Sequence, residues 1–417
     1  MRRRIIHIPV VTALAVSALV GCSNNPQGES RTLTMFASTD AKSAYEPVIK
    51  AFEGANPGVK INVTWGSGNE FESTEATQLT SGSGPDLVDV LPGTGGNLIT
   101  VGSLVKQGHL EDLSGTSWAA EIPDSLRSQT DINGKTYVLP GLLQPLGAFY
   151  NTQALQETGL RPPATWSELL KFCAKAKAGG KVPFSLGLSD QWVGQLVPYA
   201  LAATLVYGPT PDWNAQLQAG KVTFPDSAWE QVFGKYLELQ KAGCFSADPN
   251  GISFDNTLPP VAKGEAVAIV QVGGVFGQIQ NLNKDARYQF QALPATDDAK
   301  ATYIPASPGH GVGVNAKSLN KKLAIDFVNF MALPKNLNAM AKTVGGGVPA
   351  ISNQEFQPAE LLNPFNDLVA AGHVSPFPDT GWPNPQIQNA QLVGIQNLFL
   401  GKATPEQVLT AMQEALN

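Results

Sequence analysis

Apolar residues recur with two different periods along the first part of the chain. Residues 32–36 form a short apolar run, and residues 59–65 alternate apolar with polar side chains, which is typical of strands. Between them, the apolar positions of 45–52 are spaced as on one face of a helix. A polar helical stretch at 70–81 then precedes the strand-like run 86–91. Strands that alternate with helices predict a largely parallel sheet with helices on its faces.

A similar alternation returns later in the chain and indicates a second α/β region. Strands are expected at 182–187 and 264–270, with a long apolar helix face at 227–241 between them. Residues 405–416 form a closing helix with Thr404 as its cap. The 417 residues are too many for a single core, so two or three domains are expected.

Three segments interrupt these patterns with proline or glycine. In 134–145, Pro140 and Pro145 cut a short strand, and a proline cannot donate to a sheet ladder. This favours a segment that crosses at the edge of a sheet. Glycines mark two further breaks, a second crossing strand at 310–315 and an irregular stretch at 345–349.

The N-terminus has the pattern of an export signal. Three arginines at 2–4 precede an apolar run at 5–20, which Pro9 interrupts and which is short for a membrane span. The run ends Leu-Val-Gly before Cys22 and resembles the lipobox of bacterial lipoproteins, in which the chain is cut before the cysteine and that cysteine is lipid-modified. We therefore expect a signal peptide at 1–21, a lipid anchor on Cys22 and a flexible tether over 22–31; an uncleaved anchor or a plain signal is the alternative.

Charge and composition narrow the class of protein. The composition, 43% hydrophobic and 15% charged, is that of a soluble globular protein. Without residues 1–21 the chain has 25 basic residues, because Arg2, Arg3 and Arg4 are lost from 28, against 34 acidic ones. A net charge near −9 argues against nucleic acid as a partner.

Two cysteines remain after Cys22. Cys173 lies on the apolar face of a helix that begins with a capping box, Thr165 followed three residues later by Glu168. Cys244 comes just past the end of another helix. In an exported protein two such cysteines indicate a disulfide, whereas in the cytosol they would be core thiols. We expect them to be bridged.

Catalytic and metal-binding patterns find little support. The sequence contains no G-x-S-x-G, H-E-x-x-H, C-x-x-C or Walker A motif. The glycines of 311–316 nominally match a dinucleotide motif but lie within a predicted strand rather than between a strand and a helix. His109, His310 and His373 are far apart in sequence, so we expect no metal and no cofactor.

Six short motifs together resemble family 1 extracellular solute-binding proteins, the maltose-binding-protein-like components of ABC importers. They are GSGPDLV at 82–88, GKTYVLP at 134–140, YN at 150–151, TWSELL at 165–170, KGEA at 263–266 and VPA at 348–350. Each is weak alone, but they occur in the family's order behind a lipobox.

The resemblance implies an α/β, two-lobed fold of the type II periplasmic-binding-protein kind, with three crossover segments between the lobes. The crossings would lie near 139–145, 309–314 and 345–349. The N-terminal lobe would comprise 32–140 and 312–347, and the C-terminal lobe 141–311 and 348–417. Binding would close the lobes around the ligand, since contacts from both exist together only in the closed state.

Candidate ligand-binding residues come from strand ends, loops and the first crossing. A sugar needs aromatic platforms together with planar amides and carboxylates. Trp192 and Trp382 lie in loops, and Trp65 ends a strand. The resemblance adds Thr39 and Asp40 after the first strand, Gln144 where maltose-binding relatives carry an acid, and Gly274 and Phe276 where many carry a tryptophan. Those substitutions, and the bare backbone of 92–96, depart from the maltose site.

We therefore expect a monomeric, lipid-anchored receptor outside the cytoplasm, held at the bacterial cell membrane through Cys22, that delivers an oligosaccharide or glycoside to an ABC permease and catalyses nothing. A non-sugar polar solute is the alternative within this class. A secreted glycosidase, with two carboxylates about 5–9 Å apart in one cleft, and an adhesion or scaffolding lipoprotein are the alternatives outside it.

Overall fold

The computed structural model describes residues 31–95 and 97–416, and residues from Arg31 onward form one compact unit. The predicted signal peptide, the lipidation site Cys22 and nearly all of the tether lie outside the described residues. Within the described part, no helix combines the length and the apolar character that crossing a membrane requires.

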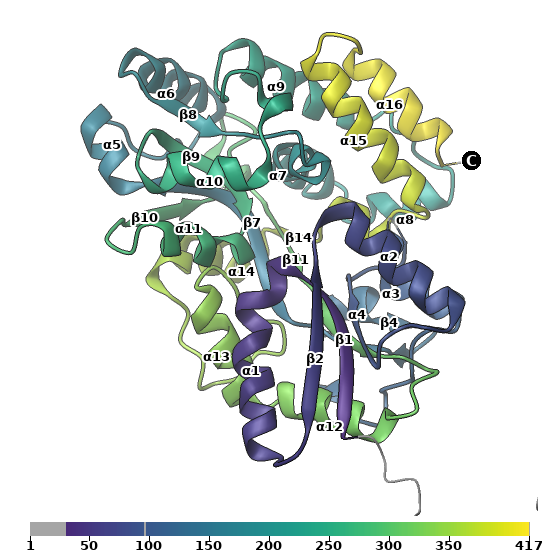
Figure 1. Ribbon diagram of the computed structural model, residues 1–417. Coiled ribbons are helices and arrows are strands. Elements are labelled where there is room, and N and C mark those ends of the chain that lie inside the picture. Colours follow the sequence, from purple (N-terminus) through teal and green to yellow (C-terminus); the bar gives the residue numbers. More distant parts are fainter. Residues whose placement is uncertain (1–30, 96, 417) are drawn as a thin grey trace, which may run out of the picture. The chain divides into compact units, whose positions relative to one another are not determined.

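The first sheet has the strand order β2-β1-β3-β12-β6 (Figure 1). Its strands are β1 (Thr32–Ser38), β2 (Lys60–Gly66), β3 (Leu87–Val90), β6 (Val138–Leu139) and β12 (Gly311–Val314). β1 pairs in parallel with β2 and β3, as the alternation of strands and helices predicts, whereas β12 is antiparallel to β3 and β6. A small hairpin of β4 (Asp131–Ile132) and β5 (Lys135–Thr136) directly precedes β6 in the sequence.

Both faces of this sheet are covered because β1 buries side chains on each. Leu33 and Met35 belong to one core and Phe36 to the other. The helices of this region are α1 (Lys42–Ala55), α2 (Gly68–Ser81), α3 (Val101–Lys106), α4 (Asp124–Thr130), α12 (Lys321–Met331) and α13 (Pro334–Val344), with 3₁₀ turns η1 (Thr39–Ala41) and η2 (Ser117–Glu121).

The second sheet is built around the long strand β7 (Leu142–Asn151). Its other strands are β8 (Val182–Ser185), β9 (Ala266–Val272), β10 (Tyr288–Gln291), β11 (Ile304–Pro308), β13 (Val348–Pro349) and β14 (Val374–Ser375). β9, β10, β11 and β13 all pair antiparallel with β7, while β8 runs parallel to β9 and β14 parallel to β11. This sheet is more mixed than the alternation of strands and helices predicts.

The second sheet and its helices share one large core. The helices are α5 (Thr152–Thr158), α6 (Trp166–Ala178), α7 (Leu196–Ala202), α8 (Trp213–Gln218), α9 (Trp229–Lys241), α10 (Phe254–Ala262), α11 (Phe276–Leu282), α14 (Asn363–Ala370), α15 (Pro385–Phe399) and α16 (Pro405–Glu414), and a π-helical segment, Ala203–Tyr207, follows α7. The 3₁₀ turns are η3 (Gln191–Gln195), η5 (Pro249–Gly251), η6 (Gly273–Val275), η7 (Ala299–Ala301), η8 (Glu360–Leu362) and η9 (Pro378–Gly381).

The chain passes between the two sheets three times. Pro140 and Gly141 join β6 to β7, Gly309 and His310 join β11 to β12, and the glycines of 345–347 join α13 to β13. The predicted two-lobed fold with three crossover segments is therefore confirmed. The first lobe is hereafter the one with β1 and the second the one with β7.

The local predictions in the second lobe hold in part. The Thr165 hydroxyl accepts from the Glu168 amide at the start of α6, but the Glu168 carboxylate accepts from Ala164 rather than from Thr165. Cys173 on α6 and Cys244 after α9 form the expected disulfide, with their Cα atoms 5.0 Å apart.

Candidate functional site

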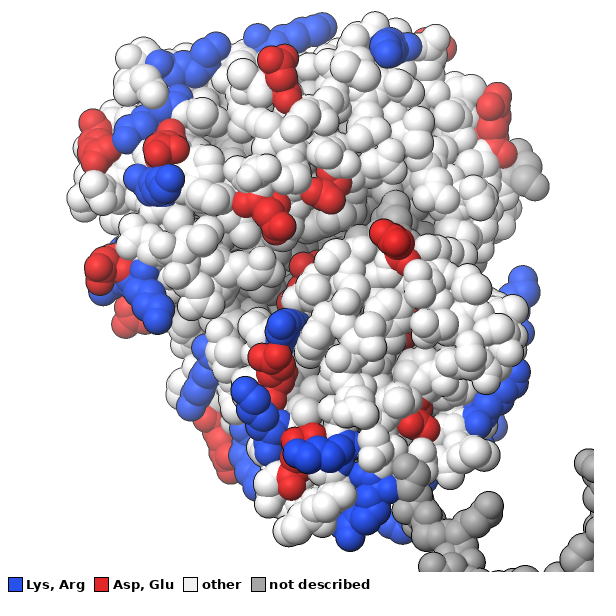
Figure 2. All heavy atoms as spheres, in the orientation of Figure 1, with Lys and Arg blue, Asp and Glu red and all other residues white. Residues whose placement is uncertain are grey.

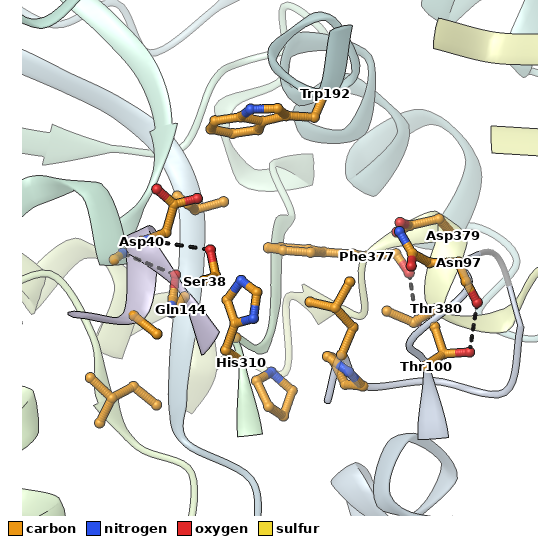
Figure 3. Close-up of a pocket in the computed structure, with 18 of the residues that line it drawn as sticks. Ser38, Asp40, Asn97, Thr100, Gln144, Trp192, His310, Phe377, Asp379 and Thr380 are labelled. Atoms are coloured by element: carbon orange, nitrogen blue, oxygen red, sulfur yellow. Dashed lines mark hydrogen bonds between the residues drawn. The ribbon is translucent and has the colours of Figure 1, made fainter. Parts of the chain in front are cut away.

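A cavity of about 220 Å³, partly open to solvent, lies between the two lobes. Both lobes line it, together with Gly309 and His310 of the second crossing. The lining side chains that carry polar or aromatic groups include Ser38, Asp40, Tyr45, Phe71, Glu72, Asn97, Gln144, Trp192, Gln195, Tyr199, His310, Phe377, Asp379 and Gln388. Figure 3 shows Trp192, Phe377 and His310 pointing into this space.

The end of β1 places Asp40 at the cavity. Ser38 ends the strand, and its hydroxyl accepts a hydrogen bond from the Asp40 amide at 3.2 Å, which caps η1. The Asp40 carboxyl keeps contact with the water of the cavity, but the surrounding protein displaces enough solvent to raise its pKa, an effect that the charge of His310 partly offsets. A parallel strand ending in a cleft is the usual position for a ligand in an α/β protein.

Gln144 lies in β7, just after the first crossing, and its side chain is held by a hydrogen bond. Its Oε1 accepts a hydrogen bond from the Gly274 amide at 3.0 Å. A Cβ atom at Gly274 or Gly309 would meet the Gln144 amide, so a larger residue at either position would displace the end of this flexible side chain. The Gln144 side chain thus contacts Gly274 of η6 and lies next to Gly309 of the second crossing. It also lines the cavity.

His310 forms an ion pair with a carboxylate buried in the first sheet. Its Nδ1 lies 2.8 Å from Asp89 Oδ1, and Asp89 Oδ2 accepts from the Ser38 amide at 2.8 Å. Asp89 has no exposed surface. Desolvation lowers the pKa of His310, but the charge and hydrogen bond of Asp89, together with the charges of Asp40 and Glu72, outweigh it and raise that pKa to about 9. His310 is therefore cationic at neutral pH.

Aromatic rings bound the cavity on several sides. Trp192 is half-buried and packs against Phe254 with ring centroids 5.0 Å apart. Phe377 comes from the loop before η9 and is also partly exposed. Tyr45 on α1 faces the cavity from the opposite lobe. Flat apolar faces of this kind can stack on a ring or on a cation.

The two lobes also meet through their backbones. The Thr94 amide, in the loop after β3, donates to the Thr380 carbonyl oxygen at 2.9 Å. A Cβ atom at Gly93 or Gly95 would collide with the backbone of η9 or of the residues after it. The bare backbone of this loop therefore permits a close approach that larger residues would block.

Four of the eight predicted ligand-binding residues line the cavity: Asp40, Gln144, Trp192 and Gly274. Thr39 lies at its mouth, in a neighbouring groove that shares Asp40 and Trp192 with the cavity. The Thr39 hydroxyl is 2.7 Å from that of Ser67.

The other three predicted residues do not reach the cavity. Trp382 is fully buried among Tyr199, Phe224 and Trp229, so it belongs to the core of the second lobe and has no face free for a ligand. The expectation that it stacks on the ligand is wrong for this conformation. A loop tryptophan has the same local pattern whether its loop packs inward or faces a cleft.

Trp65 and Phe276 are turned away from the cavity as well. Trp65 packs on the first core, with the Lys42 ammonium 5.7 Å from its ring centroid. Phe276 stacks on Phe149 at 5.3 Å and contacts Tyr288 edge-on. Both rings are partly buried against neighbouring side chains of their own lobe and lie outside the cavity.

Sequence reasoning missed most of the polar and aromatic residues that line the cavity, among them Tyr45, Glu72, His310, Phe377 and Asp379. The sequence held a signal for His310. Its partner Asp89 lies among apolar residues in a strand, and a buried carboxylate needs a hydrogen-bonding or charged partner. The others lie on a helix face or in loops whose sequence gives no direction.

This architecture defines a class, the two-lobed solute receptors that close over a ligand. A sequence profile described as bacterial extracellular solute-binding protein matches residues 37–337. The chain therefore belongs to this family, and the resemblance noted in the sequence is confirmed.

Individual relatives are distant but cover most of the chain. The multiple sugar-binding protein of Streptococcus mutans is 22% identical over 84% of this chain and 85% of its own length. The melibiose/raffinose/stachyose-binding protein MelE of Bacillus subtilis is 24% identical over 79% of this chain and 78% of its own length. Among solved structures, the raffinose complex of RafE superposes with a TM-score of 0.78 at 17% identity. The match covers 93% of this chain and 98% of RafE. A chitin oligosaccharide binding protein superposes with a TM-score of 0.77 at 20% identity. That match covers 92% of this chain and 98% of the other.

Proposed function

We propose that this protein is an extracytoplasmic receptor that binds a carbohydrate in the interlobe cavity and delivers it to the permease of an ABC importer. The observation that carries the proposal is the composition of the cavity. Trp192 and Phe377 offer aromatic faces, and carboxyl and amide groups from both lobes surround them. Sugars present flat apolar faces and many hydroxyl groups, which such a lining complements.

The relatives support the same class of ligand. Two of them are named for the sugars that they bind, and the structure of RafE contains raffinose. They are receptors rather than enzymes. The anchor at Cys22 is part of the proposal, and a 24% identical relative from Streptomyces antibioticus is named a lipoprotein.

Closure supplies the mechanism. The cavity walls come from both lobes, so a ligand that contacts both binds the closed state better than the open one and shifts the population toward it. The three crossings act as the hinge because they are the covalent links between the sheets. No bond in the ligand is made or broken.

A binding screen with a matched variant tests the proposal. Calorimetry with mono- and oligosaccharides should find at least one ligand, and Trp192→Ala should weaken its binding, because Trp192 faces the cavity. Trp65→Ala is the control, since Trp65 is also partly exposed but lies outside the cavity. Equal losses in both variants would contradict the proposed site, and release of hydrolysis products from a bound glycan would contradict a receptor without catalysis.

A further inference from the structure

The cavity is more acidic than a neutral ligand requires. Three carboxyl groups line it, those of Asp40, Glu72 and Asp379, and among the described lining residues His310 is the one basic side chain. His310 is already paired with Asp89. Figure 2 shows acidic side chains on both sides of the groove between the lobes, while the basic ones lie mostly farther out.

Two of these carboxyl groups come from opposite lobes, and the charge of Glu72 contributes to raising the pKa of Asp379. Glu72 lies on α2 of the first lobe, and its Oε2 accepts from Asn97 Nδ2 at 2.6 Å. Asp379 lies in η9 of the second lobe, and its Oδ2 accepts from Gln388 Nε2 at 2.8 Å. Figure 3 draws Asn97 and Asp379 on the same side of the cavity, across from Asp40 and Gln144, so the hydrogen-bond partner of Glu72 and the other carboxyl group line the same part of it.

The Asp379 side chain has an unused acceptor. Its Oδ1 is buried and has no hydrogen-bond donor at bonding distance and angle among the described residues, although the Tyr199 hydroxyl and the Thr380 amide lie near enough to the carboxyl to lower its pKa. Burial first, and then the charge of Glu72 among others, raise the pKa of Asp379 to about 7. In this arrangement two carboxyl groups of like charge line a space from which the protein displaces water, and Asp379 Oδ1 has no donor at bonding geometry among the described residues.

A cation between the two carboxyl groups would relieve both problems. An ammonium group supplies three donors and one positive charge, whereas a hydroxyl supplies one donor and no charge. The aromatic faces of Trp192 and Phe377 are also compatible with a cationic ligand. We propose that the ligand is a carbohydrate that carries a protonated amine, and that Glu72 and Asp379 bind this amine from opposite lobes in the closed state. This inference rests on the proposed carbohydrate-binding function.

The amine also makes binding depend on pH. The titratable groups around Asp379 are Glu72 on α2, Tyr199 on α7, Tyr207 at the end of the π-helical segment and, across the cavity, His310. Asp379 takes up a proton as the pH falls through about 7 and then has no charge to offer. Affinity for the amine should therefore decline from pH 8 to pH 5, whereas affinity for a neutral analogue should change little.

Matched pairs of sugars test the inference by calorimetry at pH 8. Each pair has one backbone, for example β-1,4-linked glucosamine oligomers against their N-acetylated forms, with the galactosamine series and putrescine added. We expect the free amine to bind about tenfold more tightly or better, as for a hydrogen bond to a charged group. Asp379→Asn and Glu72→Gln should each remove most of this preference. Glu70→Gln, on the same helix but exposed and outside the cavity, should retain it.

The outcomes separate the two proposals. Neutral sugars that bind as tightly as their amines, or a preference that survives both variants, would overturn the amine while leaving carbohydrate binding intact. Binding of putrescine but of no sugar would overturn the carbohydrate function itself. Thermal unfolding of each variant checks that a lost preference does not reflect a lost fold.

Discussion

The ion pair of His310 with Asp89 should make the stability of the unliganded protein depend on pH. The change that tests it is His310→Gln, which keeps a hydrogen-bond donor near Asp89 and removes the positive charge. Asp89 has no exposed surface and the His310 side chain is only 21% exposed, so solvent screens the pair weakly. A buried carboxylate that loses its counter-charge is destabilised.

The pKa of His310 sets the size of the expected loss of stability in His310→Gln. Its rise from 6.5 to about 9 corresponds to about 3 kcal/mol, since each tenfold change in proton affinity is worth about 1.4 kcal/mol. Because the folded-state pKa is the higher one, this stabilisation is complete below pH 6.5 and is lost as the pH rises through about 9. We therefore expect His310→Gln to be about 3 kcal/mol less stable than the natural protein at pH 6, and to approach it at pH 10.

Urea unfolding at both pH values measures this difference. His373→Gln is the matched control, because His373 contacts the Thr302 carbonyl and stacks on Tyr303 instead of pairing with a buried carboxylate. Groups that titrate elsewhere affect all three proteins alike and cancel in the comparison. If the loss in His310→Gln is the same at pH 6 and pH 10, the charge of His310 does not stabilise the fold and the reasoning fails.

Three further changes test the core, the disulfide and closure. Trp382→Ala should lower the free energy of unfolding by about 3–5 kcal/mol, as for other buried aromatic residues, and Trp192→Ala by much less; equal losses in urea would contradict the burial of Trp382. Reduction of Cys173–Cys244, or serine at both positions, should cost about 4 kcal/mol, and calorimetry with and without reductant would reveal no change if the bond contributes nothing. Gly95→Ala should weaken ligand binding about tenfold without lowering unliganded stability, because the new methyl group meets the backbone only when the lobes close; small-angle scattering that still reports full closure would count against it.

Regular patterns along the chain were sufficient for the fold. The apolar positions of 45–52 are the buried face of α1, because a helix repeats its environment every three to four residues and needs no distant partner to specify it. The breaks at 134–145 and 345–349 mark crossings since proline and glycine limit the backbone wherever they occur. Asp40, which follows directly after a strand of a parallel sheet, was predictable at the cavity for the same kind of reason.

Contacts between distant residues decided the rest of the site. The sequence by itself determined the two α/β regions, the crossings and the cysteines available to pair, because each depends on local periodicity or on residue type. Only the tertiary structure decided that Trp382 packs inward, that His310 pairs with Asp89 across 221 positions, and that Asp379 and Glu72 line one cavity from opposite lobes. Such pairings depend on how two lobes and their loops meet in space, and no spacing along the chain encodes that meeting.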